Sequence, residues 1–279
     1  MKPSLNRLTL TPPTDQEIRE LCQIINETLG FKYTLQKKYL ITNRLNKRLS
    51  ELGIEHYQAY LTLLRQEPLE RDFFCELVTT NVTKFYRETI QFELLAEKLL
   101  PELAETKKGT KKMRCWSAGC SSGEEAYSMA ITCRETLGTD WDIKVLATDI
   151  NSAQLKIGSA GIYSTEKVNS VPKKWRAKYF LPHQSEHNFQ ITPQLRKDVI
   201  FRLANLMDIN SLPATVHLDF IMCRNVFIYL SKEARAQILD HFYSRLNTGG
   251  YLLLGHSESI DPDFRHYWLP LGKSIYRKR

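Results

Sequence analysis

The sequence predicts a small all-α N-terminal domain followed by a larger α/β domain built on a parallel sheet flanked by helices. Up to about residue 90, apolar residues recur at helical spacing, and no strand pattern interrupts them. From Lys112 onward, short β-rich apolar segments alternate with helical ones. A third pattern, short strands separated by polar turns at about residues 173–202, predicts a small antiparallel subdomain inserted in the α/β domain.

In the N-terminal region we expect four or five amphipathic helices. Pro12, Pro13 and Pro68 stand where helices begin, and Gly30 and Gly53 stand where helices end, because glycine readily adopts the left-handed conformation of a helix C-terminus. The apolar positions of the two clearest helices are Ile18, Leu21, Ile25 and Leu29, then Ile41, Leu45, Leu49 and Leu52.

The α/β region begins with a helix at about residues 90–104 and a polar loop, ETKKGTKK. We therefore assign residues 1–88 to the helical domain and residues 89–279 to the α/β domain. The expected strands are KMRCW, IKVLATDI, VIFRLANL, LDFIMC, YLLLGH and SIYRKR.

The composition is that of a globular protein with room for one large and one small core: 279 residues, 42% hydrophobic and 25% charged. No apolar stretch approaches the roughly 20 residues that span a bilayer, and no signal-peptide core is seen, which predicts a cytoplasmic protein without membrane insertion. The six cysteines form no CxxC pair, so we expect reduced thiols and no metal site. The net charge of +8 favours an acidic partner, whether nucleic acid, an anionic membrane surface or a carboxylate-rich protein.

A ligand-binding turn is expected in MRCWSAGCSSGEEAYSMAITCRETLG, between a hydrophobic strand and a helix. Gly119 and Gly123 let the backbone approach a ligand, but their GxxxG order differs from the GxGxxG of a pyrophosphate site. Glu124 suits a ligand with an amine or hydroxyls and repels a phosphate. The alternative is a helix-capping role, since Ser122 and Glu125 have capping-box spacing and acidic residues stabilise a helix N-terminus.

Asp149 ends the second expected strand, 26 residues after Gly123, where nucleotide-binding α/β folds place an acidic residue on a ribose. A helix-capping or loop role is the alternative for this residue too. Together, the glycine turn and the two carboxylates describe an adenosine ligand without phosphates, and S-adenosylmethionine is the candidate.

Four blocks carry a resemblance over nearly the whole chain: TTNVTKFYRE (79–88), WSAGCSSGEEAYS (116–128), ATDINSAQLKIGSAGIY (147–163) and CRNVFIYL (223–230), supported by GHSES (255–259). In these blocks the chain resembles the CheR family of chemotaxis receptor glutamate O-methyltransferases. The resemblance implies a class I (Rossmann-like) S-adenosylmethionine methyltransferase domain, with S-adenosylhomocysteine as the product and no metal. One departure is Ala126, where the family usually has proline in the first helical turn.

Residue-by-residue matching to the family implies a set of cofactor contacts. Arg87 would bind the methionine carboxylate of the cofactor as a bidentate guanidinium pair. Asn205 and Leu206 would line the adenine end, and Asn225 and Val226 would follow the fourth strand at the active site. The complete set implied for the cofactor is Asn81, Thr83, Arg87, Gly119, Glu124, Asp149, Asn205, Leu206, Asn225 and Val226.

The acceptor is expected to be a glutamate, which is already ionised at neutral pH, since its unperturbed pKa is about 4.3. No general base is therefore required, and positioning groups matter more. Tyr243 and Arg224 are the candidates to orient the acceptor, although each could equally be a packing residue or a surface charge.

A basic helix suggests how the receptor is recognised. Arg44 and Arg48 are four residues apart and Lys37 is seven before Arg44, opposite the apolar face, which predicts an outward basic stripe. Arg44, Lys47 and Arg48 are the residues expected to bind the substrate. The segment NRLNKRL resembles the family's receptor-recognition helix, which meets the acidic methylation helices of the receptor. A merely solvated helix face is the alternative. Because the loop LPHQSEHNFQ lacks the glycine of family members that bind the receptor's C-terminal pentapeptide, we expect no pentapeptide binding.

Two other functions compete with this interpretation. A nucleic-acid methyltransferase would fit the net charge, but CRNV stands where an NPPY-type acceptor loop would be expected, so we predict no nucleic-acid partner. A non-catalytic module that senses S-adenosylmethionine or scaffolds a signalling complex is the other alternative. We expect a monomer.

Overall fold

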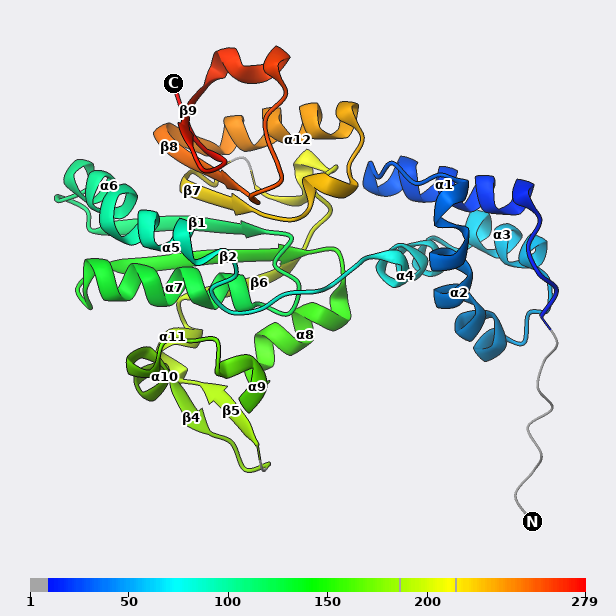
Figure 1. The fold of residues 1–279 in the computed structure, drawn as a ribbon, viewed down its shortest axis with the longest axis horizontal. Coiled ribbons are helices and arrows are strands. Elements are labelled where there is room, and N and C mark those ends of the chain that lie inside the picture. The colour runs from blue at the N-terminus through cyan, green and yellow to red at the C-terminus, as the bar shows by residue number, and fades with distance from the viewer. Residues whose placement is uncertain (1–9, 186, 214) are drawn as a thin grey trace. The chain divides into compact units, whose positions relative to one another are not determined.

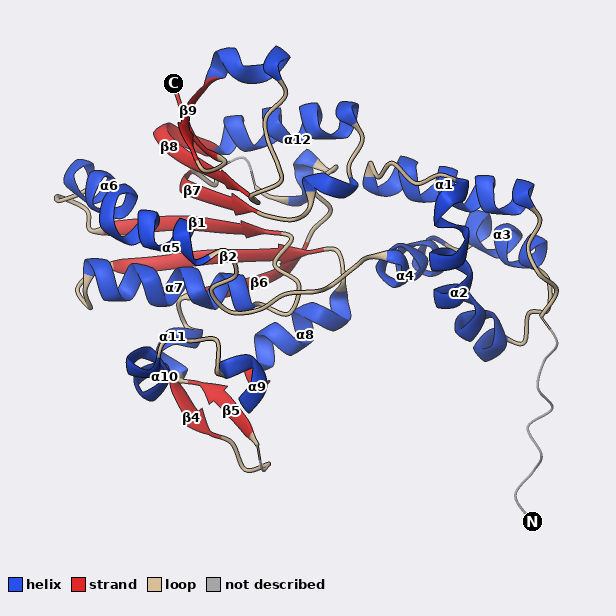
Figure 2. Cartoon of the chain, viewed as in Figure 1, coloured by secondary structure: helices blue, strands red, loops and turns tan. Residues whose placement is uncertain are grey.

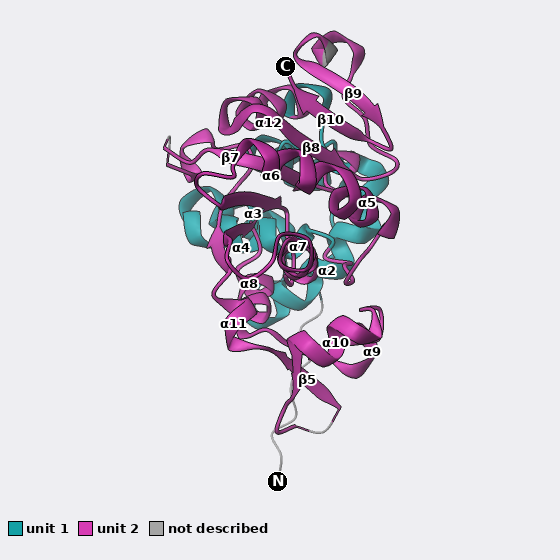
Figure 3. Ribbon diagram, turned by 90° about the vertical axis from the view of Figure 1, so that its left-hand side faces the viewer, with its two compact units in different colours: residues 1–80, 229–234 teal, residues 81–228, 235–279 magenta. Residues whose placement is uncertain are grey.

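The structure is a computed structural model that describes residues 10–185, 187–213 and 215–279. The chain forms two compact units, one comprising residues up to Thr80 together with Tyr229–Ala234, the other residues 81–228 and 235–279 (Figure 3). The segment 81–88 belongs to the second unit and not to the helical unit, because it bonds to that unit's helices. For example, the Tyr86 amide donates to Ser128 Oγ at 3.0 Å.

The helical unit is built as the apolar periodicity predicted. Seven of the eight apolar positions predicted for its first two long helices are buried, and only Leu52, in the last turn before the left-handed Gly53, is 37% exposed. A capping box between Thr14 and Glu17 fixes the start of the first helix. The helices of this unit are α1 (Asp15–Leu29), η1 (Leu35–Lys37), α2 (Lys38–Leu52), α3 (Tyr57–Gln66) and α4 (Pro68–Val78) (Figure 1).

The second unit is organised on a seven-stranded sheet of order β6-β2-β1-β7-β8-β10-β9 (Figure 2). Neighbouring strands are parallel from β6 to β8, and β10 is antiparallel to both β8 and β9. The six strands expected from the sequence are present, while β9 was not anticipated. The strands are β1 (Lys112–Ala118), β2 (Asp142–Asp149), β6 (Val199–Leu203), β7 (Leu218–Cys223), β8 (Leu246–Leu254), β9 (Trp268–Gly272) and β10 (Ile275–Lys278).

The sheet order reverses at β1, which has β2 on one side and β7 on the other. In open parallel sheets, such a switch point opens a crevice at the carboxyl ends of the two strands, and ligands bind there. The fold therefore places the glycine turn after β1 at the position where a ligand site is expected.

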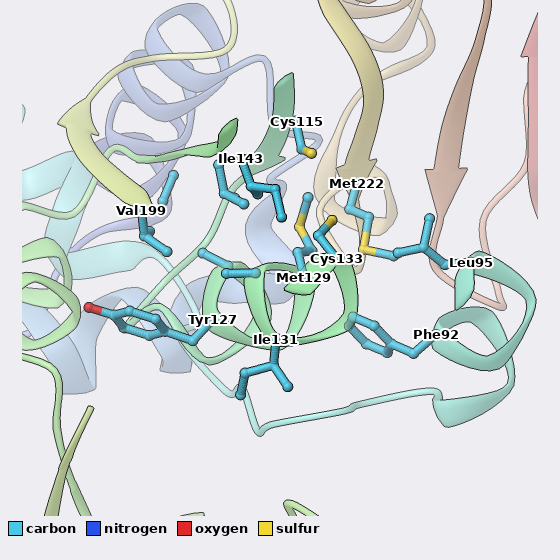
Figure 4. Packing of buried hydrophobic residues seen from close by; sticks show 14 of the residues in the cluster. Phe92, Leu95, Cys115, Tyr127, Met129, Ile131, Cys133, Ile143, Val199 and Met222 are labelled. Carbon is cyan, nitrogen blue, oxygen red and sulfur yellow. The ribbon is translucent and has the colours of Figure 1, made fainter. Parts of the chain in front are cut away.

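Helices cover both faces of the sheet, as the alternating side chains of β1 illustrate. Cys115 faces the cluster formed with Met129 and Cys133 of α7 (Figure 4). Trp116 faces the other side and packs edge-on against Phe242 of α12, with ring centroids 5.1 Å apart. The main helical segments of this unit are α5 (Thr89–Leu94), the π-helical η2 (Leu95–Leu99), α6 (Leu100–Thr106), α7 (Glu124–Leu137), α8 (Ser152–Ala160) and α12 (Lys232–Arg245). Shorter turns are η3 (Ile209–Ser211), η4 (Phe227–Tyr229) and η5 (Pro262–Tyr267).

A small antiparallel sheet of order β3-β5-β4 is inserted between α8 and β6. Its bounds differ from the expected 173–202: the sheet starts at Ile162, residues 173–179 are helical, and residues 199–202 belong to the main sheet. The elements of this inserted subdomain are β3 (Ile162–Ser164), α9 (Thr165–Val168), α10 (Lys173–Tyr179), β4 (Phe180–Pro182), β5 (Asn188–Ile191) and α11 (Pro193–Arg196).

No helix in the described ranges is both long and apolar enough to cross a membrane.

The packing of α8 on β6 can be tested at Gly158, where an added Cβ would lie 2.5 Å from Cε1 of Phe201. Gly158→Ala should lower the free energy of unfolding by about 1–3 kcal/mol, because the packed ring must shift. Gly109→Ala is the matched control, since a Cβ there meets nothing within 4 Å. Urea denaturation of both variants measures the difference, and equal midpoints would show that the α8–β6 contact is not tight.

Candidate functional site

The turn between β1 and α7 has an unusual backbone. Gly119 and Gly123 have φ values of 81° and 91°, and Ser121 between them has φ 49°. Such left-handed conformations are easy for glycine and costly for serine, so surrounding contacts must hold the turn. The amides of Gly119 and Cys120 both donate to the Thr148 carbonyl, at 2.9 and 2.8 Å. The turn is thereby tied to the end of β2.

Gly119 also lies directly against the loop that follows β7. A Cβ added to Gly119 would be 2.7 Å from Cγ2 of Val226, so no larger residue fits without a shift. This close approach joins the carboxyl ends of β1 and β7 at the switch point of the sheet. Two residues implied by the family resemblance, distant in sequence, are thus brought together.

Asp149 fixes the loops around the end of β2. One carboxylate oxygen accepts the Ser121 amide at 2.7 Å, and the other accepts the Asn151 amide at 2.9 Å. The Asp149 carbonyl accepts the Ala204 amide at 3.0 Å, which places Asn205 and the half-buried Leu206 beside it, just after β6. Asp149, Asn205 and Leu206 therefore share the carboxyl edge of the sheet with Gly119 and Val226.

Glu124 is fully buried, with 0% of its surface exposed. Its carboxylate accepts a hydrogen bond from Ser122 Oγ at 2.6 Å and one from Lys167 Nζ of α9 at 2.5 Å. The capping box expected between Ser122 and Glu125 is not formed: the N-cap of α7 is Gly123, which has no side chain to accept a capping hydrogen bond. Glu124 is thus a buried carboxylate paired with a cation and not a helix cap.

The segment 81–88 folds back over the glycine turn. The Asn81 carbonyl accepts a bond from Ser121 Oγ at 3.3 Å, and the Arg87 guanidinium donates to the Val82 carbonyl at 2.9 Å. Thr83 is half-buried within the same segment. Tyr86 and Glu88 have φ values of 52° and 60°, and such non-glycine residues persist only where the structure holds them.

Arg224 holds that segment in place and is not free to orient an acceptor. It is only 6% exposed, and its Nε donates to Glu125 at 2.7 Å. Its Nη1 donates to the Arg87 carbonyl at 2.6 Å and to Gln91 at 3.3 Å. The guanidinium lies 4.9 Å from the centroid of the Phe92 ring. The expectation of an acceptor-orienting group is therefore corrected to that of a positioning residue.

Glu258 was missed as an individual residue, although GHSES was recognised as a supporting block. It is 4% exposed, and its carboxylate accepts the amides of Asn225, Gly255 and Ile228 at 2.8, 2.6 and 3.1 Å. Burial raises the pKa of Glu258, while these backbone donors oppose the rise. Glu258 thus fixes the loop in which Asn225 takes a left-handed φ of 60°.

Tyr243 does not reach this edge of the sheet. Its ring lies 5.5 Å from that of Trp268 and 4.2 Å from Lys278 Nζ. Because β10 runs antiparallel to β8, Lys278 lies near the start of β8, at the amino edge of the parallel strands. The sequence-based expectation for Tyr243 is contradicted: it is a packing residue at the opposite edge.

The outward basic stripe on α2 is also corrected. The Arg44 guanidinium donates to the Thr79 and Leu77 carbonyls, at 2.5 and 3.3 Å, at the end of α4. Arg48 forms a two-bonded pair with Glu70 of α4. These long side chains reach sideways to the neighbouring helix, so they stabilise the α2–α4 packing. Only Lys47 of the three faces outward, with 85% of its side chain exposed.

All six cysteines are buried and free of disulfides. Within the part of the chain that the structure describes, no group of three or more His, Cys, Asp and Glu side chains could hold a metal ion.

The parallel sheet reverses its order at β1, a glycine turn follows β1, an acidic residue ends β2, and antiparallel β10 lies beyond β8. This is the Rossmann-like fold expected of a class I S-adenosylmethionine-dependent methyltransferase. The family models agree: "CheR methyltransferase, SAM binding domain" matches residues 81–272, and "CheR methyltransferase, all-alpha domain" matches residues 16–79. The chain belongs to the CheR methyltransferase family.

Curated relatives named as chemotaxis protein methyltransferases match this chain over most of their length. A chemotaxis protein methyltransferase of Borreliella burgdorferi is 35% identical over 254 residues, covering 88% of this chain and 89% of the relative. A chemotaxis protein methyltransferase of Klebsiella aerogenes is 34% identical, with 95% and 90% covered. Chemotaxis protein methyltransferase 2 of Pseudomonas aeruginosa is 32% identical, with 94% and 93% covered.

The different placements of Arg224 and Tyr243 can be tested by cofactor binding. Arg224→Lys should weaken S-adenosylhomocysteine binding about tenfold, equal to ~1.4 kcal/mol, because lysine cannot bridge Glu125 and the Arg87 carbonyl with a planar fork. Tyr243→Phe should leave the affinity within about twofold, since no cofactor group is expected at that edge. Isothermal titration calorimetry measures both, and a large loss in Tyr243→Phe would contradict the assignment of its role.

Proposed function

We propose that this protein transfers a methyl group from S-adenosylmethionine to the side-chain carboxylate of glutamates in the cytoplasmic methylation helices of chemotaxis receptors, giving methyl esters. One observation carries the proposal: Gly119, Val226, Asp149 and Asn205 share the carboxyl edge of the sheet around its switch point, in a chain of the CheR family. We further propose that the protein is a cytoplasmic monomer that binds no nucleic acid and does not insert in membranes.

The donor set at this edge fits the cofactor. Asp149 and Glu124 supply carboxylates suited to ribose hydroxyls and an ammonium, and the glycine turn brings backbone to the same edge of the sheet. Arg87, a half-buried residue of the segment 81–88, is proposed to pair its guanidinium with the cofactor's carboxylate. The full proposed set is that given by the resemblance: Asn81, Thr83, Arg87, Gly119, Glu124, Asp149, Asn205, Leu206, Asn225 and Val226.

The chemistry needs alignment more than proton transfer. When bound, S-adenosylmethionine supplies a methyl group on a positively charged sulfonium. Transfer of that methyl group to an acceptor carboxylate would replace the carbon–sulfur bond by a carbon–oxygen bond, cancel both charges and move no proton. The residues here must hold the two partners in line and keep water out. Arg224 is already paired with Glu125, so its positive charge is not available to bind the acceptor carboxylate.

The ester can be detected directly. Incubating the protein with methyl-labelled S-adenosylmethionine and receptor-containing membranes should place base-labile label on receptor glutamates, because methyl esters hydrolyse in base. Asp149→Asn should lose most of this activity, since asparagine cannot accept both the Ser121 and Asn151 amides. Absence of base-labile label with the wild-type protein would favour the sensor or scaffold alternative.

Receptor recognition is proposed to use the exposed side of α2. Lys47 is its outward cation, whereas Arg44 and Arg48 hold α2 against α4. The loop between β4 and β5 lacks glycine, and apart from Glu186, which lies outside the described residues, it is closed by local bonds such as His183 Nδ1 to Ser185 Oγ at 2.8 Å. We therefore keep the proposal that recognition does not depend on the receptor's C-terminal pentapeptide.

The role of Lys47 can be tested with a charge reversal. Lys47→Glu should raise KM for receptor about three- to tenfold, because an exposed charge steers an acidic partner. It should leave S-adenosylhomocysteine affinity unchanged, because Lys47 is not among the proposed cofactor contacts. Arg19→Glu, an equal charge change on an exposed residue of α1, is the control. Methylation rates over a series of receptor concentrations give the answer, and equal effects of the two variants would argue for general charge and against recognition by α2.

A further inference from the structure

Lys167 is the cation that accompanies the most deeply buried carboxylate at the proposed cofactor site. Its Nζ lies 2.5 Å from Glu124 Oε1, and the Glu124 side chain is wholly buried while that of Lys167 is 41% exposed. The Lys167 ammonium is also 3.4 Å from Ser122 Oγ, which bonds the other Glu124 oxygen. Burying a carboxylate without a partner costs free energy, so the Lys167 side chain contributes a needed positive charge beside Glu124.

Lys167 comes from the inserted subdomain and not from the sheet that builds the site. It lies in α9, whose start is capped by Ser164 Oγ, the acceptor of the Lys167 amide at 3.4 Å. Thr165 ties α9 to the small sheet, because its amide and hydroxyl both donate to the His187 carbonyl, at 2.8 and 2.9 Å. Beneath α9, Tyr163 Oη donates to the Ser122 carbonyl at 2.7 Å. The base of Lys167 is therefore fixed beside the turn, whereas its long, half-exposed side chain can change rotamer.

The α-ammonium of S-adenosylmethionine is the same chemical group as the Lys167 terminus. One buried carboxylate balances one positive charge, and two ammonium groups beside it in a region of low dielectric would repel each other. The one with an exit to solvent must leave. Lys167 has that exit, since its side chain reaches Glu124 from the surface.

We propose that the Lys167 ammonium occupies the position that the α-ammonium of the cofactor takes when it binds, so that Lys167 must then withdraw from Glu124. This inference rests on the proposed function. Lys167 is thus a tethered competitor that keeps Glu124 neutralised in the free protein and lowers the affinity for ligands that carry the ammonium.

The test compares two ligands that differ in the relevant group. S-adenosylhomocysteine has the α-ammonium, whereas 5′-methylthioadenosine shares the adenosine and thioether but lacks the amino-acid part. By calorimetry, Lys167→Met should bind S-adenosylhomocysteine at least about fivefold more tightly and 5′-methylthioadenosine within about twofold of wild type. If Lys167→Met does not fold, Lys167→Gln replaces it in the test. Glutamine keeps a hydrogen-bond donor without the charge, and this variant should also bind S-adenosylhomocysteine more tightly.

Lys178→Met is the matched control, because Lys178 is also a lysine of the inserted subdomain that pairs with a glutamate of α7. Its Nζ lies 2.6 Å from Glu135 Oε1. It should alter neither affinity. Glu124→Gln should weaken S-adenosylhomocysteine selectively, and adding Lys167→Met to it should have no further effect.

Equal changes for both ligands in Lys167→Met, or weaker binding of S-adenosylhomocysteine, would overturn the competitor role. If the wild-type protein bound neither ligand, the proposed function itself would fail. Wild-type binding without a selective change would overturn only the inference about Lys167.

Discussion

The buried ion pair between Arg224 and Glu125 is the interaction on which the site depends. Glu125 stands in the first turn of α7 and also accepts a bond from Ser117 of β1 at 2.7 Å. Arg224, at the end of β7, extends the connection to the Arg87 carbonyl in the segment 81–88. Removing one member of such a pair leaves an uncompensated charge that costs about 3–5 kcal/mol. A single contact therefore sets the spacing of the two switch-point strands, the helix and the segment that covers the turn.

Four of the carboxylates around this edge are satisfied in two ways. Glu124 and Glu125 each have a cation, whereas Asp149 and Glu258 accept backbone amides. Amide donors fix loops without adding a positive charge, and Asp149 brings its carboxylate beside the turn in this way. That arrangement favours a cationic ligand with hydroxyl groups, and it disfavours phosphates, in agreement with the GxxxG order of the turn.

Much of the fold was predictable because it depends on local periodicity. The alternation of β1, for instance, assigns Cys115 and Trp116 to opposite faces, and both are buried there. The sequence did not reveal the direction of every strand, or the contacts between elements that are far apart along the chain. Tyr243 was placed on the correct helix but at the wrong edge, because its neighbours Trp268 and Lys278 come from β9, which was not anticipated, and from β10, whose antiparallel direction was not. Likewise, helical spacing gave the face of Arg44 but not the adjacent α4 carbonyls that it binds.

Lys167 escaped the sequence analysis for the same reason, since its partner is 43 residues away and belongs to another element. Its tether has a consequence for turnover. Methyl transfer removes the sulfonium charge but leaves the α-ammonium, so any contact of that ammonium with Glu124 holds product as firmly as substrate. A lysine fixed nearby acts at a high effective concentration, on the order of millimolar for a short tether, and can replace the departing ammonium without exposing Glu124 unpaired. The same competition that weakens cofactor binding therefore assists product release, and in methyltransferases limited by release the two effects would partly offset each other.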